Sequence, residues 1–228
     1  MSLLSVPRRA LILGITVGLS AFGAACNTNG SAGGASSALT RPNKDSIATP
    51  APDSFKVAVE TSKGNFTIMA HRDWAPRGVD RFYHLVRLGY FDEARFFRVL
   101  RGFMAQFGIN GDPRVNSAWE PLTLEADPVK QTNTRGRVTF AQGMDPNTRT
   151  TQLFINYGDN SNLDASGFSP IGEVIDGMAV VDSLYANYGE GAPDGGGPDQ
   201  GRIQSEGNAY LNQSFPRLDF IRRARIVP

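Results

Sequence analysis

Residues 95–108 read "RFFRVLRGFMAQFG", an aromatic stretch that contains two long polar side chains, Arg98 and Gln106. Its alternation predicts two strands, at 95–100 and 102–107. Because successive side chains of a strand point to opposite faces, each strand presents one hydrogen-bonding side chain beside apolar neighbours. Two interpretations are open on these residues alone: a solvated, outward-facing strand, or polar groups directed into an apolar groove.

The alternation also assigns faces to the neighbours of these polar side chains. On the second strand, Met104 and Gln106 share one face, and Phe103 is expected on the other. On the first strand, Phe96 is expected to share the face of Arg98. If the groove interpretation holds, its wall therefore includes Met104.

The rest of the chain predicts a mainly β fold. Two strands surround a turn at Lys63-Gly64, and amphipathic helices follow between Pro76 and Gly89 and within 176–189. Further strands are expected at 121–126, 136–142, 151–157, 168–175 and 218–226. About eight mainly antiparallel strands with two principal helices indicate a closed eight-stranded barrel capped by the two α-helices.

An extra C-terminal loop interrupts this pattern. Residues 189–201 read "GEGAPDGGGPDQG", and a short helix is expected after them, at 203–213. The loop has many glycines but lacks the Lys-Ser/Thr and the strand-to-helix context of a phosphate-binding loop. Its composition therefore predicts a flexible loop.

The first 26 residues are typical of an export signal. Arg8 and Arg9 precede an apolar run at 10–22, which is shorter than the roughly 20 residues that span a bilayer. Small residues then lead to the single cysteine, Cys26, as in a bacterial lipobox, although Gly23 stands where a larger aliphatic residue is usual. This predicts an exported lipoprotein, anchored in the cell envelope through Cys26. The alternative is plain secretion with Cys26 as a free thiol.

The segment between the signal and the domain is expected to be a flexible linker. Residues 27–54 are rich in Gly, Ser, Ala, Thr and Pro and contain almost no large apolar side chains. Such a segment buries too little apolar surface to offset its ordering entropy. The globular domain is therefore predicted at 55–228.

Composition excludes several classes of function. A formal net charge of +1 favours neither nucleic acid nor an anionic membrane surface as a partner. One cysteine cannot form an intramolecular disulfide, and the two histidines, His71 and His84, lie outside any metalloprotease or nucleophile-elbow motif. No metal or cofactor is therefore expected, and the protein is expected to be a monomer.

Four segments carry a resemblance to a known family. They are "FFRVLRGFMAQFG" (96–108), "PNTRTTQLFIN" (146–156), "NLD" (162–164) and "FSPIGEVIDGMAVVD" (168–182). In this order and spacing they resemble the cyclophilin family of peptidyl-prolyl isomerases, across residues 55–227. The resemblance implies an eight-stranded antiparallel barrel with a helix closing each end and a substrate groove on its outer face.

The resemblance also implies roles for individual residues. Arg98 matches the family's catalytic arginine, and Gln106, the second residue assigned to the catalytic pair, would anchor the peptide beside it. The substrate-binding positions are Phe103, Met104, Ala141, Gln142, Gln152, Phe154, Leu163 and Phe168. Gln142 replaces the usual asparagine, Phe168 stands where many members have histidine, and Asn162 stands where some have tryptophan. The last replacement disfavours tight cyclosporin binding.

These residue types suit proline isomerisation. Amide resonance gives the X–Pro bond a rotation barrier of ~18–20 kcal/mol, and no covalent bond is broken, so no nucleophile is required. A donor such as Arg98 that favours a pyramidal prolyl nitrogen lowers this barrier. The sequence thus predicts a prolyl isomerase that folds exported or envelope proteins. The alternative is a non-catalytic chaperone or scaffold that binds proline-containing segments; the presence of Arg98, Gln106 and Phe154 favours the enzyme.

Overall fold

The computed structural model describes residues 37–47 and 49–228. Within them, eight strands form one antiparallel sheet in the order β3-β4-β6-β5-β7-β2-β1-β8. The strands are β1 (Ser54–Thr61), β2 (Asn65–His71), β3 (Arg98–Leu100), β4 (Met104–Phe107), β5 (Arg137–Phe140), β6 (Leu153–Asn156), β7 (Pro170–Asp176) and β8 (Ile221–Val227). The predicted mainly β, antiparallel fold is confirmed.

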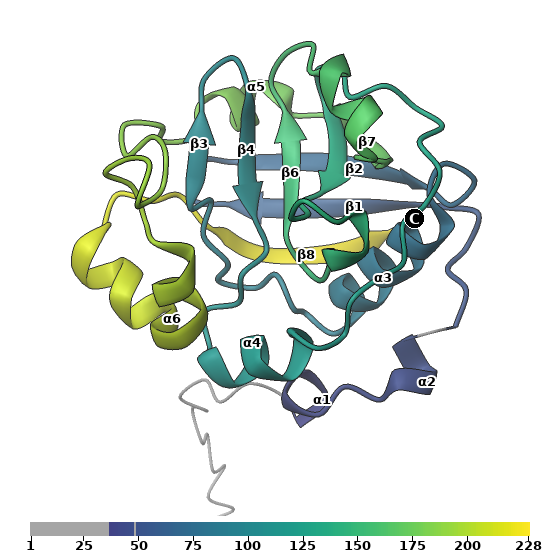
Figure 1. Cartoon of the computed structure of the whole chain (residues 1–228), viewed down its shortest axis with the longest axis horizontal. Helices are drawn as coiled ribbons and strands as arrows, with labels where there is room; N and C mark the ends of the chain where they lie inside the picture. Colours follow the sequence, from purple (N-terminus) through teal and green to yellow (C-terminus); the bar gives the residue numbers. More distant parts are fainter. Residues whose placement is uncertain (1–36, 48) are drawn as a thin grey trace, which may run out of the picture. The chain divides into compact units, whose positions relative to one another are not determined.

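The sheet curls into a half-barrel, so that β3, β4 and β6 cross in front of β1, β2 and β8 (Figure 1). The closed barrel expected from the sequence is not seen, because β3 and β8 are edge strands that do not pair with each other. The chain segments before them do meet: Arg95 and Phe220 form an isolated antiparallel bridge, and Phe96 donates its backbone N–H to the carbonyl of Asp219 at 2.9 Å. This short pairing joins the two sides of an otherwise open sheet.

Helices cover the sheet and the loops between its strands. They are α1 (Ser37–Thr40), α2 (Lys44–Ile47), α3 (Pro76–Arg87), α4 (Pro113–Trp119), α5 (Met178–Asp182) and α6 (Gln200–Ser214), with 3-10 turns η1 (Pro146–Thr148) and η2 (Ser161–Ser166). The first predicted amphipathic helix is α3, which buries Val79, Phe82, Leu85 and Val86. This helix contacts β2, β7 and β8, and its apolar stripe joins the main core.

Two local predictions were wrong, and one helix was missed. Residues 121–126 form no strand, because their backbone pairs with the chain at a single bridge between Leu124 and Arg149. The second principal helix is only α5, because the chain leaves the helix at Ser183 and the backbone N–H of Tyr185 then donates to Asp219. Helix α4 was missed, although Asp112 caps its first turn by accepting from the backbone N–H of Arg114.

The ordered packing begins earlier in the chain than the predicted domain boundary at residue 55. Trp119 donates its indole N–H to the carbonyl of Leu39 at 2.9 Å, and the backbone N–H of Ala51 donates to Asp80 at 2.8 Å. Leu39 and Ala51 are both buried in the main core. The predicted signal segment, Cys26 and the first part of the predicted linker lie outside the described residues. Among the residues that are described, no helix has the length and apolarity needed to cross a membrane.

Candidate active site

The ten groove residues predicted from the sequence line a single cavity of about 420 Å³. They are Arg98, Phe103, Met104, Gln106, Ala141, Gln142, Gln152, Phe154, Leu163 and Phe168. The structure adds Gly143, Thr148, Thr150 and Gln200 to the lining. Asn162 lies on η2, exposed to solvent and outside this lining.

Strand pairing brings the central residues together. Arg98 on β3 lies opposite Gln106 on β4, and Gln106 lies opposite Phe154 on β6. Directly opposed residues of an antiparallel sheet project from the same face, so these three side chains form a row across three strands. The predicted shared face of Met104 and Gln106 is confirmed, since both line the cavity.

The strict alternation predicted wrong positions for Phe103 and Phe96. Phe103 precedes β4 and lies in a turn, where its backbone N–H donates to the carbonyl of Leu100 and Gly102 has a φ of +79°. The turn frees its ring from the strand pattern and lets it line the cavity. Phe96 precedes β3 and is fully buried in the main core. Both strands are shorter than expected, so alternation does not extend to these residues.

A chain of hydrogen bonds fixes the polar side of the groove. Arg98 donates from Nη1 to Oε1 of Gln106 at 3.1 Å, and Gln106 donates from Nε2 to Oε1 of Gln152 at 2.9 Å. Gln106 is buried, so its amide orientation is determined by these two partners. The predicted pair of Arg98 and Gln106 therefore acts as one connected unit.

A carboxylate that the sequence analysis missed completes this unit. Glu190 accepts from Nε and Nη2 of Arg98 at 2.5 and 2.6 Å, which is a two-pronged ion pair. The Arg98 guanidinium holds the pKa of Glu190 below its ordinary value, against the opposing effect of burial, and the backbone N–H of Gly191 adds a smaller contribution that also lowers the pKa. Sequence motifs and strand alternation relate residues that are close in the chain. They could not identify this pair, because Arg98 and Glu190 lie 92 positions apart.

Aromatic side chains and a methionine form the apolar side of the groove. Met104 and Phe154 are almost completely buried, and Phe154 meets Phe168 edge to face with ring centroids 5.8 Å apart. The ring of Phe103 lies 5.8 Å from the Arg98 guanidinium carbon. An apolar ring bound against this wall would therefore sit next to a permanent cation.

A buried arginine, Arg81, supports the chain segment that carries Thr148 and Thr150. Arg81 donates from Nη1 to the carbonyls of Leu122 and Thr150 at 2.7 and 3.0 Å. Burial lowers the pKa of Arg81 to about 10, and the nearby Arg149 contributes in the same direction. Both threonines belong to segment 146–156, which carries part of the family resemblance, so the sequence could have identified them as groove residues.

The described lining contains no histidine, cysteine, aspartate or glutamate. In the part of the chain that the structure describes, no group of three or more such residues could hold a metal ion. The groove thus consists of an apolar wall and a set of amide and guanidinium groups. Such groups can bind and polarise a ligand by hydrogen bonding.

A family model described as "Cyclophilin type peptidyl-prolyl cis-trans isomerase/CLD" matches residues 56–203. The chain belongs to the cyclophilin family of peptidyl-prolyl cis-trans isomerases. The match ends near the start of α6, so most of that helix and all of β8 lie beyond the matched cyclophilin region.

Two curated relatives agree with this membership, and one solved structure agrees with the fold. The chain is 36% identical over 136 residues to peptidyl-prolyl cis-trans isomerase B of Escherichia coli (strain K12), which covers 56% of this chain and 82% of the relative. It is 33% identical over 136 residues to peptidyl-prolyl cis-trans isomerase cyp18 of Streptomyces antibioticus, covering 56% of this chain and 81% of the relative. A crystal structure of a cyclophilin-type isomerase from Cryptosporidium parvum is similar with a TM-score of 0.57 at 20% identity, covering 77% of this chain and 98% of that one. The last similarity concerns the fold alone.

Proposed function

We propose that Arg98 is the catalytic residue of this isomerase and that the apolar wall of the groove holds the proline ring of the substrate. The supporting observation is that the hydrogen-bonded chain of Arg98, Gln106 and Gln152 lines the same cavity as the apolar side chains of Met104 and Phe154. A proline ring needs an apolar surface, and the twisting amide needs a donor near its nitrogen. The groove supplies both within the reach of one dipeptide.

The physical effect of Arg98 follows from the electronic structure of the amide. In the planar ground state the prolyl nitrogen shares its lone pair with the carbonyl, and in the twisted transition state the nitrogen becomes pyramidal and regains it. A donor directed at the prolyl side of the bond is bound more strongly in the transition state than in the ground state, which lowers the barrier. A charged donor in a partly buried groove is stronger than a neutral one.

Exchange NMR on an X–Pro peptide tests this function directly. Uncatalysed isomerisation takes tens to hundreds of seconds, so the cis and trans signals of the free peptide do not exchange within a mixing time of about a second. With a small amount of the protein, we expect exchange cross-peaks between the two forms. Chemical shift changes that report binding without any cross-peaks would instead favour the non-catalytic binding module.

We also propose that the isomerase is an exported bacterial lipoprotein that assists the folding of exported or envelope proteins. The proposal rests on the sequence of residues 1–26, in which two arginines, an apolar run and small residues precede Cys26. Residues 27–36 would then contribute a tether between the anchor and the domain.

The mass of the mature N-terminus tests the anchor. After expression of the full chain in a bacterial host, we expect a mature protein that begins at Cys26 and carries acyl chains, found in the membrane fraction. The variant Cys26→Ser should stay unprocessed and carry no lipid. An unmodified mature chain in the soluble fraction would instead establish plain secretion.

A further inference from the structure

The extension between α5 and β8 places a carboxylate against the groove arginine. Glu190 precedes the loop at 191–199, and this loop lies beside the edge strand β3 (Figure 1). Because β3 has a neighbouring strand on one side only, the side chain of Arg98 has no strand to support it on the outer side. The extension supplies that support through the ion pair.

The glycine-rich loop is folded around Glu190. The backbone N–H of Gly197 donates to the carbonyl of Glu190 at 2.8 Å, and the backbone N–H of Gly191 donates to Oε1 of the same residue at 2.9 Å. A Cβ atom at Gly195 or Gly197 would collide with the Glu190 carbonyl. The glycines therefore permit a close backbone approach that holds Glu190 at both its main chain and its carboxylate. This corrects the expectation of a merely flexible loop.

Helix α6 fixes the far end of the loop to the same strand. Its buried residues Ile203 and Leu211 pack in an apolar cluster with Phe97, which directly precedes Arg98. Asp199 caps the helix by accepting from the backbone N–H of Arg202 at 2.8 Å, and Gln200 follows it into the groove lining. The extension is thus anchored at Arg98 through Glu190 and at the preceding Phe97 through α6.

This arrangement determines which nitrogen of the guanidinium faces the groove. Nε and Nη2 both donate to Glu190, and only Nη1 is directed toward Gln106 and, at 3.9 Å, the sulfur of Met104. Without Glu190 the flexible arginine side chain could rotate and present any of its donors, or none. We propose that Glu190 is a positioning residue that holds Arg98 with Nη1 toward the prolyl bond. This inference rests on the proposed catalytic role of Arg98.

The ion pair of Arg98 and Glu190 is formed at neutral pH. Because Arg98 lowers the pKa of Glu190 below its ordinary value of 4.5, the carboxylate is ionised at neutral pH and loses its charge only when the pH falls through that lowered value. The pair is therefore a permanent element of the site at neutral pH. If Glu190 instead weakened catalysis by neutralising the charge of Arg98, its removal would increase turnover.

The variant Glu190→Gln tests whether Glu190 orients the side chain of Arg98. Its amide can offer only one acceptor to the guanidinium, so Arg98 should lose its fixed orientation. With an X–Pro peptide at saturation, we expect the catalysed cis–trans rate to fall about 10-fold, because misplacement of a catalytic group lowers turnover. The peptide dissociation constant should change little, since the apolar wall is intact. In ¹H–¹⁵N spectra the Nε–H signal of Arg98, assigned with Arg98→Lys, should shift and exchange faster with water.

Glu206→Gln is the matched control. Glu206 also accepts from Nε and Nη2 of an arginine, Arg202, but this pair lies on the solvent side of α6, away from the groove. Its loss should leave turnover and the Arg98 signal unchanged. Glu190→Asp keeps the charge on a shorter side chain and should recover part of the turnover.

Three outcomes would overturn the positioning role. They are unchanged turnover in Glu190→Gln, increased turnover, and an equal loss of turnover and of peptide affinity. In each of these cases a normal rate for the wild type would leave the proposed function standing. If the wild type itself failed to catalyse exchange, both proposals would fail together, whatever the Arg98 signal showed.

Discussion

Replacing Arg98 by alanine is expected to remove most of the isomerase activity while the protein stays folded. Arg98 is the only cation in the described lining of the groove, and its loss removes the donor that stabilises the pyramidal prolyl nitrogen. Loss of a single preorganised donor of this kind typically costs about 100-fold or more in turnover. Glu190 would lose its partner, but its side chain is 34% exposed, so water can solvate the carboxylate. Exchange NMR and thermal unfolding of the same sample measure both effects.

Arg101→Ala is the matched control for this variant. Arg101 lies in the turn that connects β3 to β4 and donates to the carbonyl of Asp182 at 3.1 Å, outside the groove lining. Its removal should leave turnover near the wild-type rate. Arg98→Lys should fall between the two, because an ammonium group keeps the charge but cannot bridge Glu190 and the groove at once. Near-normal turnover of Arg98→Ala would contradict the catalytic role.

The groove was predictable because its main residues lie close together in the sequence. Arg98 and Gln106 are on consecutive strands joined by a short turn, so alternation alone assigns each a face, and the antiparallel pairing places them opposite each other. The family resemblance then identified which face is the groove. The errors at Phe96 and Phe103 arose at strand ends, where the chain stops alternating and periodicity no longer determines direction.

Contacts between distant segments were not predictable in this way. The ion pair of Arg98 with Glu190 joins residues that are separated in the chain by four strands, β4 to β7. The many glycines around Glu190 suit both a flexible loop and a tightly folded one, and only the structure shows that they allow close approach to its carbonyl. The packing of Leu39 was missed for a similar reason, because its partner Trp119 belongs to a helix far away in the sequence.

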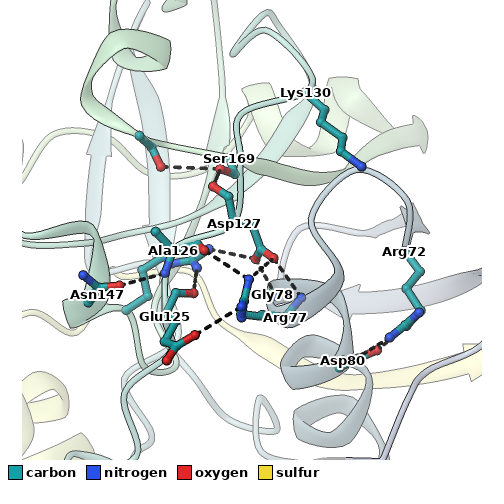
Figure 2. A network of polar contacts seen from close by, with 12 residues as sticks. Arg72, Arg77, Gly78, Asp80, Glu125, Ala126, Asp127, Lys130, Asn147 and Ser169 are labelled. Carbon is teal, nitrogen blue, oxygen red and sulfur yellow. Dashed lines mark hydrogen bonds and ion pairs between the residues drawn. The ribbon is translucent and has the colours of Figure 1, made fainter.

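The N-terminus of α3 is a further long-range contact, and it is important for stability. Its N-cap residue, Ala75, has no side-chain acceptor, so the first backbone N–H groups of the helix need a partner from elsewhere. Asp127 supplies it, accepting from the backbone N–H groups of Arg77 and Gly78 at 3.0 and 2.9 Å (Figure 2). Arg149 donates to the same carboxylate at 3.3 Å.

Asp127→Ala is therefore expected to lower the free energy of unfolding by about 3–5 kcal/mol, the usual cost of removing one member of a buried ion pair. The side chains of Asp127 and Arg149 are 0% and 1% exposed, so the remaining guanidinium could not be hydrated. Burial already lowers the pKa of Arg149, and Asp127 is the group that opposes this effect. Urea unfolding followed by circular dichroism measures the loss as a lower midpoint at an unchanged slope.

Two further variants determine whether the loss comes from this buried network. Glu125→Gln breaks the neighbouring pair with Arg77, but the Glu125 side chain is 78% exposed, so the expected change is below about 1 kcal/mol. In the double variant of Asp127→Ala with Arg149→Met, no buried charge is left without a partner, so the loss should be smaller than the sum of the two single losses. Additive losses, or an Asp127→Ala variant as stable as Glu125→Gln, would show that Asp127 does not hold Arg149 and the start of α3 together.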